Sequence, residues 1–159
     1  MHHELRSCKT GALLFGCEAP SLKACVEAAL EQGVDITYAQ LAAANLRGAK
    51  LAGVRLTCAD LRAADLTGAD LTGADLCRVY AAGANLTGAI LVSTRLDFAN
   101  LRGADCRAAR FDGARGVRLN LRGADLRTAT FEGSQLDRAD LAGALSEGAA
   151  AVLEEMVGS

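Results

Sequence analysis

The chain has 159 residues, the size of a single domain, and carries a formal net charge of −2. Apolar residues make up 51% of it and aromatic residues only 4%, so the apolar mass consists of Ala and Leu. The total charge marks neither a nucleic-acid binder nor a strongly acidic protein.

The cysteine pattern and the lack of long apolar runs favour a cytoplasmic protein. The six Cys include no C-x-x-C pair, and the only two His are His2 and His3, so the sequence offers no clustered ligands for zinc. We find no signal peptide and no apolar run long enough to cross a membrane. We therefore expect free thiols in a reducing cytoplasm, no cofactor or metal, and no membrane partner.

Residues 1–33 are predicted to form an N-terminal cap. Residues 5–9 and 12–17 are typical of a short hairpin with its turn at Thr10 and Gly11. A helix is expected to follow, with Ser21 as its N-cap, an apolar stripe at helical spacing, and an end at Gly33. The stripe predicts that this helix covers the segment that comes next.

Residues 34–145 are dominated by a period of five. A large apolar residue recurs at every fifth position from Ile36 onward, and only Ala81, Cys106 and Gly116 interrupt the 22 units. We call this position i; position i−2 is usually Ala, and position i+2 is often Gly. A period of five fits neither a helix nor a continuous strand. Residues i−2 and i do share one side of a short extended piece, however, and Gly suits a corner after it.

A chain that bends once per unit must wind into a solenoid with residues i−2 and i inside. Cys106 is then a small core residue, and Leu119 fills part of the gap left by Gly116. The open ends of such a solenoid need covering. The residues expected to define the core are Leu46, Leu66, Leu86, Leu126, Phe111 and Phe131.

The units at 69–73 (Ala-Asp-Leu-Thr-Gly) and 84–88 (Ala-Asn-Leu-Thr-Gly) resemble the A(D/N)LxG signature of pentapeptide-repeat proteins. The resemblance implies a mainly β fold, a right-handed, four-sided parallel β-helix of about 5.5 coils in this chain. On such a coil, Phe111 and Phe131 would stack on one inner face. No insertion breaks the register, so the inserted loops of the quinolone-protecting members of the family are absent.

Residues 146–159 are predicted to form a helix with Ser146 as its N-cap. Its short apolar stripe could cover the end of the solenoid or, as in several members of the family, form a homodimer contact. The candidate dimer residues are Val152, Leu153, Met156 and Val157.

Arginine forms the clearest surface pattern. Arg102 and Arg122 occupy position i+1 one coil apart, Arg107 and Arg127 do the same on the next face, and Arg62 extends these columns. These five residues are our candidate surface for an anionic protein partner. Alternatively, the runs Arg-Gly-Ala-Asp at 102–105 and 122–125 place each Arg across a corner from an Asp, so that the two columns neutralise each other.

The acidic residues suggest an alternative function. Asp60, Asp65, Asp70 and Asp75 occupy position i−1 on all four sides of one coil. Some family members mimic duplex DNA with an acidic rod and bind DNA gyrase, so a DNA mimic that acts on a topoisomerase or another DNA-binding enzyme is one hypothesis. The acidic band is brief here, however, and the adjoining coils are basic.

Catalysis has little support, because both His are terminal and no Ser/His/Asp set is present. The preferred hypothesis is a non-enzymatic interaction scaffold whose rigid charged rod binds a protein partner. Direct contact with nucleic acid is not expected.

Overall fold

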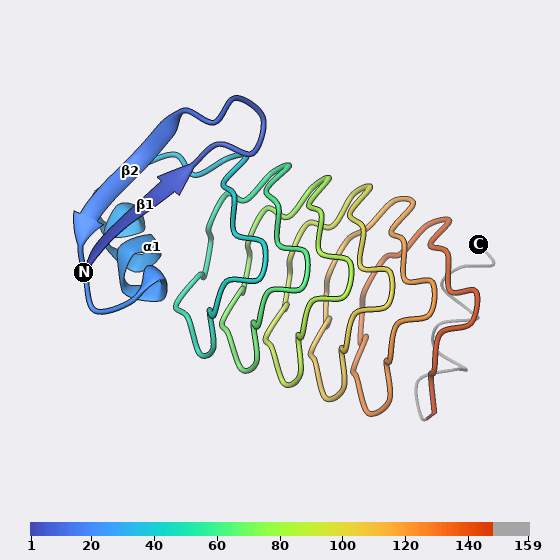
Figure 1. Ribbon diagram of the computed structural model, residues 1–159. Coiled ribbons are helices and arrows are strands. Elements are labelled where there is room, and N and C mark those ends of the chain that lie inside the picture. Colours follow the sequence, from blue (N-terminus) through green and yellow to red (C-terminus); the bar gives the residue numbers. More distant parts are fainter. Residues whose placement is uncertain (148–159) are drawn as a thin grey trace.

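The computed structural model describes residues 1–147 and shows a small cap at one end of a regular solenoid (Figure 1). The cap contains strand β1 (His2–Arg6), strand β2 (Leu13–Glu18) and helix α1 (Leu22–Glu31). The predicted C-terminal helix is not among the described residues beyond its first two. The same holds for the candidate dimer residues, which are Val152, Leu153, Met156 and Val157.

The hairpin is present, but the predicted strand bounds are wrong. β1 ends at Arg6, and its Leu5 pairs with Phe15 of β2 in an antiparallel register. Between the strands, the Ser7 amide donates to the Ala12 carbonyl at 2.9 Å. The strand cannot extend to residue 9 in the hairpin, because the Cys8 amide instead bonds a carbonyl of the solenoid.

Helix α1 agrees with its sequence signals. The Ser21 hydroxyl oxygen accepts a hydrogen bond from the Ala24 amide at 3.2 Å, as expected of an N-cap. Gly33 has a φ of +69° just after the helix, in the left-handed region that favours Gly. Cys25, Val26 and Ala29 are fully buried, so the apolar stripe faces inward.

The first coil has no preceding coil to bond, and the cap provides hydrogen-bond partners for some of its backbone groups. The Gln40 amide donates to the Arg6 carbonyl at 2.7 Å. The Lys50 amide donates to Glu27 Oε1 of α1 at 2.9 Å, and Lys23 Nζ donates to a first-coil carbonyl. The hairpin and α1 together therefore provide hydrogen-bond partners at this end of the solenoid.

The coil repeats every twenty residues. Residue i−1 of each unit forms a parallel bridge with the residue twenty positions later, from Gln40 with Asp60 to Asp125 with Leu145. Five-residue units therefore give four sides per coil. We name the four faces by their core residue in one coil: Leu61 for face A, Leu66 for face B, Leu71 for face C and Leu76 for face D.

The core has the predicted composition. The six core-defining residues are at most 3% exposed: Leu46, Leu66, Leu86, Leu126, Phe111 and Phe131. The two Phe rings stack in adjacent coils with centroids 5.0 Å apart and an interplanar angle of 3°. Cys106 is fully buried, and burial raises the pKa of its thiol to about 12.

Each unit bends through a β-turn from residue i to residue i+3. In a typical turn, the Ala64 amide donates to the Leu61 carbonyl at 3.0 Å. Residue i+2 has a positive φ in every unit from Tyr38 to Gly143, between 54° and 71°. Gly fills only half of these positions, although it is the residue that adopts such a φ at little cost.

Candidate interaction surface

The outward Asp and Asn residues at i−1 have a structural role in the turns. The amide of residue i+1 forms no backbone hydrogen bond to a neighbouring coil in the described units. In twelve units it instead donates a hydrogen bond to the side chain of Asp or Asn at i−1. The Thr72 amide, for example, donates to Asp70 Oδ1 at 3.0 Å. The acidic band therefore holds the backbone, and its acidity alone does not indicate a binding face.

Where i−1 offers no such acceptor, an Asp of the preceding coil can replace it. Asp97 accepts from the Val117 amide at 2.9 Å, and Asp112 accepts from the Glu132 amide at 3.0 Å. Both hydrogen bonds join residues twenty positions apart, so they also tie neighbouring coils together.

The structure places the five predicted arginines in the expected columns, but four of them form ion pairs. Arg62 pairs with Asp60 at 2.6 Å, Arg107 with Asp105 at 2.6 Å and Arg127 with Asp125 at 2.7 Å. These three pairs join i+1 to i−1 of the same unit, since both positions point outward. The hydrogen bonds and charge of these arginines lower the pKa of each Asp, for Asp125 to about 2.

No ion pair joins Arg102 to Asp105 or Arg122 to Asp125 across the corner. Asp105 and Asp125 are engaged by arginines two residues later in the chain, and Arg122 instead pairs with Asp140 of the next coil at 3.2 Å. Arg102 forms no ion pair with any described residue. The columns on faces A and B are thus largely neutralised, as the alternative interpretation held, but by different partners.

The free positive charge lies on face D instead. Six arginines of the chain form no ion pair within the described residues, and five of these belong to face D. Two sit at its i−1 column and three at its i+2 corner. In chain order they are Arg55, Arg78, Arg115, Arg118 and Arg138.

The i+2 corner of face D differs from the other three corners, because none of its six positions is Gly. Its occupants all have a φ between 54° and 62°: Tyr38, Cys58, Arg78, Phe98, Arg118 and Arg138. A side chain in this region costs about 1–2 kcal/mol relative to an ordinary backbone conformation. The fold therefore carries a repeated backbone cost where Gly would avoid it, and such strain is concentrated at functional positions.

Large apolar side chains are exposed along the same corner. Phe98 is 49% exposed, Tyr80, two residues after Arg78 on face A, is 52% exposed, and Val117, next to Arg118 on face D, is 38% exposed. The Arg78 guanidinium lies 5.6 Å from the centre of the Phe98 ring, which it faces. We call this set, Arg78, Tyr80, Phe98, Val117, Arg118 and Arg138, the arginine–aromatic ridge.

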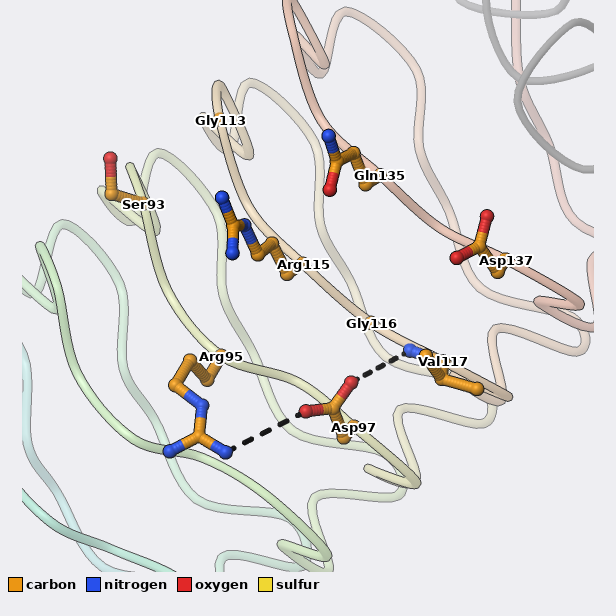
Figure 2. A pocket seen from close by; sticks show the side chains of 9 residues that line it. All are labelled: Ser93, Arg95, Asp97, Gly113, Arg115, Gly116, Val117, Gln135 and Asp137. Atoms are coloured by element: carbon orange, nitrogen blue, oxygen red, sulfur yellow. Dashed lines mark hydrogen bonds and ion pairs between the residues drawn. The ribbon is translucent and has the colours of Figure 1, made fainter.

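Face D is hollowed next to this ridge. The hollow has a volume of about 540 Å³ and is lined by Arg95, Arg115, Gly116, Val117 and neighbouring residues (Figure 2). Gly116 replaces the large core residue here, and a Cβ atom on it would lie only 3.3 Å from Leu119 Cβ. Leu119 thus closes the core gap, as predicted, and the backbone lies close to the core behind the hollow.

Charged groups of both signs line the hollow. Figure 2 shows Arg95, Arg115 and Gln135 on successive coils, with Asp97 between Arg95 and the Val117 amide. Arg95 also pairs with Asp75 at 3.1 Å, whereas Arg115 has no ion pair within residues 1–147. The hollow is therefore lined by two arginines and two aspartates, Asp97 and Asp137, and it carries charges of both signs beside the ridge.

Residues 1–147 contain no group of three potential metal ligands and no helix that could span a membrane. The six Cys are unpaired, and burial raises the pKa of Cys77 to about 11. Thiolate chemistry at neutral pH is thereby disfavoured at this position.

Sequence reasoning missed the ridge because it followed only the i+1 columns. A signal was present: every fourth unit lacks Gly at i+2, and those units carry Arg78, Phe98, Arg118 and Arg138. Tyr80, one of only two Tyr in the chain, lies beside this column.

Comparisons with known proteins agree with this architecture. The profile of the family described as Pentapeptide repeats matches residues 32–80, 82–115 and 117–145 in eight copies. The match spans well over half of the chain, and the chain belongs to the pentapeptide-repeat family.

Solved structures of the same kind are similar to it. HetL, a pentapeptide repeat protein involved in heterocyst differentiation regulation from the cyanobacterium Nostoc, is 28% identical over 67% of both chains, with a TM-score of 0.38. A pentapeptide repeat protein of the Arabidopsis thaliana thylakoid lumen is 26% identical over 74% of this chain and 75% of that one, with a TM-score of 0.46.

QnrB1, a plasmid-mediated fluoroquinolone resistance protein, is 22% identical over 70% of this chain and 71% of its own, with a TM-score of 0.31. A search of curated proteins finds no match.

Proposed function

We propose that the chain is a non-enzymatic interaction scaffold that binds a protein partner along the arginine–aromatic ridge. The observation that carries this proposal is a coincidence on one corner. Arginines without an ion pair in residues 1–147, exposed aromatic rings and a column of left-handed residues without Gly all occur there.

The residue types of the ridge are those that dominate binding energy at protein interfaces. Arg and Tyr are enriched among such residues, because they bury a large area and still form directed hydrogen bonds. Arg78, Arg118 and Arg138 have no ion pair within residues 1–147 to lose on binding, whereas Arg62 and Arg107 would first have to give up an Asp. A partner would therefore gain the most binding free energy at the ridge.

A DNA mimic remains the alternative, and the described surface favours it less. Mimicry needs a continuous negative face along the rod, yet Asp60, Asp105 and Asp125 are engaged by arginines of their own units. Our proposal predicts that micromolar amounts of the purified protein leave DNA supercoiling by gyrase unchanged. Inhibition or protection of gyrase at that level would favour the mimic.

The direct test compares two triple variants as baits for partner capture. Arg78→Gln/Arg118→Gln/Arg138→Gln removes three charges from the ridge. The matched control removes three charges from the ion-paired columns: Arg62→Gln/Arg107→Gln/Arg127→Gln.

We expect the wild-type bait and the control to retain the same protein and the ridge variant to lose it. Equal retention by both variants, or loss with the control alone, would contradict the assignment of the ridge.

A further inference from the structure

We infer that the element recognised by the ridge is an acidic helix of the partner, lying along the rod axis. This inference rests on the proposed function and adds the shape and sequence pattern of the partner.

The spacing of the charges favours a helix. Coils stack at about 4.8 Å, so Arg118 and Arg138 lie about 9.6 and 14.4 Å along the rod from Arg78. Turns of an α-helix repeat every 5.4 Å, which places side chains of one face at about 10.8 and 16.2 Å. Long Arg and Glu side chains can absorb the difference of about 1–2 Å.

An extended peptide matches this spacing less well. Its side chains on one side are about 6.8 Å apart, so its rows fall near 6.8 and 13.6 Å. The second row meets Arg138, but none lies within about 2 Å of the position of Arg118. Only two of the three arginines could then face a carboxylate.

The apolar residues define the remaining part of the pattern. Phe98 lies between Arg78 and Arg118 on the same corner. On a bound helix it would face the turn that lies between the two turns carrying acidic residues. The helix would therefore carry an acid at i, a Leu or similar residue at i+4, and acids at i+7 and i+11. Tyr80 and Val117 flank the corner on its two sides and would exclude water from the contact.

The charge of the molecule as a whole favours a protein over a nucleic acid. The ridge is basic, but the chain has a net charge of −2 and a sequence pI of about 5.7. The rest of the chain therefore has a negative net charge, and a long phosphate backbone that extends beyond the ridge would be repelled on balance. A short acidic helix is confined to the positive part.

The test measures binding of four fluorescent probes to the full-length protein by anisotropy. The first is an Ala-rich helical peptide of about 18 residues, long enough to be helical, with the acid–Leu–acid–acid pattern on one face. The second has the same composition with the acids spread around the helix, and the third keeps the pattern but contains two Pro that prevent helix formation. The fourth is a single-stranded oligothymidylate of similar length.

The inference predicts that the patterned helix binds at least about tenfold more tightly than the other three probes. Arg78→Gln/Arg118→Gln/Arg138→Gln should abolish that preference, and Arg62→Gln/Arg107→Gln/Arg127→Gln should leave it intact. Thermal melting of both variants checks that they remain folded.

The other outcomes separate the inference from the function on which it rests. Equal or tighter binding of the Pro-containing peptide, still lost with the ridge variant, overturns the helix and leaves a protein-docking ridge. Tightest binding of the oligonucleotide overturns both. If no probe binds in a ridge-dependent way, the acidic helix is refuted, and partner capture with the same variants decides the function by itself.

Discussion

Replacing Arg118 by Gly should make the protein more stable, although it removes a large side chain. Arg118 has a φ of 54°, and its side chain is exposed and forms no ion pair with described residues. Its backbone amide donates to the Asp137 carbonyl at 2.8 Å, a hydrogen bond that Gly would keep. The substitution therefore changes little besides the cost of the left-handed conformation.

The magnitude follows from two opposing effects. Relief of the left-handed Cβ contact is worth about 1–2 kcal/mol. Gly also gives the unfolded chain more freedom, which costs about 0.4–1 kcal/mol. The net gain is between about 0 and 1.6 kcal/mol, or a rise of up to about 6 °C in Tm for a chain of this size.

Arg102→Gly is the matched control. Arg102 is also exposed and without an ion pair, but it occupies i+1, where φ is not positive. The same chemical change should lower the stability there by about 0.5–1 kcal/mol. Calorimetry or urea unfolding of both variants measures the difference. The reasoning is refuted if Arg118→Gly destabilises the protein, or if both variants shift in the same direction.

Three further predictions concern the turns, acid stability and the core. Asp70→Ala leaves the Thr72 amide without its acceptor and should lower the free energy of unfolding in urea by about 1 kcal/mol, whereas Asp70→Asn should be nearly neutral. Equal losses in the two variants would refute the role of the Asp70 side chain as acceptor in the turn. The pKa of Asp125 is about 2 when folded, against about 3.9 when unfolded, so its stabilising effect is present above about pH 4 and is lost toward pH 2. Asp125→Asn should therefore flatten the fall in Tm over that range, and an unchanged slope would contradict this. Leu66→Ala should cost about 2–5 kcal/mol in the same unfolding assay, because Leu66 is 1% exposed in the core; a neutral result would contradict its inward position.

The five-residue period alone predicts the inside of this molecule well. Residues i−2 and i share one side of an extended piece in any solenoid, so Leu66 and Phe111 could be placed in the core without a structure. The coil of twenty residues came from the family resemblance, since the period fixes the bend but not how many bends close a coil. Hairpin strands were misplaced because Cys8 bonds the first coil, a contact far away in sequence.

The binding surface could not be predicted in the same way. Whether an outward Arg is free depends on side-chain geometry: Arg107 reaches Asp105 of its own unit, whereas Arg118 at the corner reaches no carboxylate in residues 1–147. The column position of both residues was already clear from the sequence. The sign of φ at i+2, which makes a corner without Gly unusual, needed the structure.

A photo-crosslinking side chain at position 98 tests the central claim most directly. The control position is Thr72, which is exposed on face C, away from the ridge. Mixed with the captured partner, the protein should form a covalent complex from position 98 and none from position 72. Crosslinking from position 72 but not from position 98 would show that the partner binds another face of the rod.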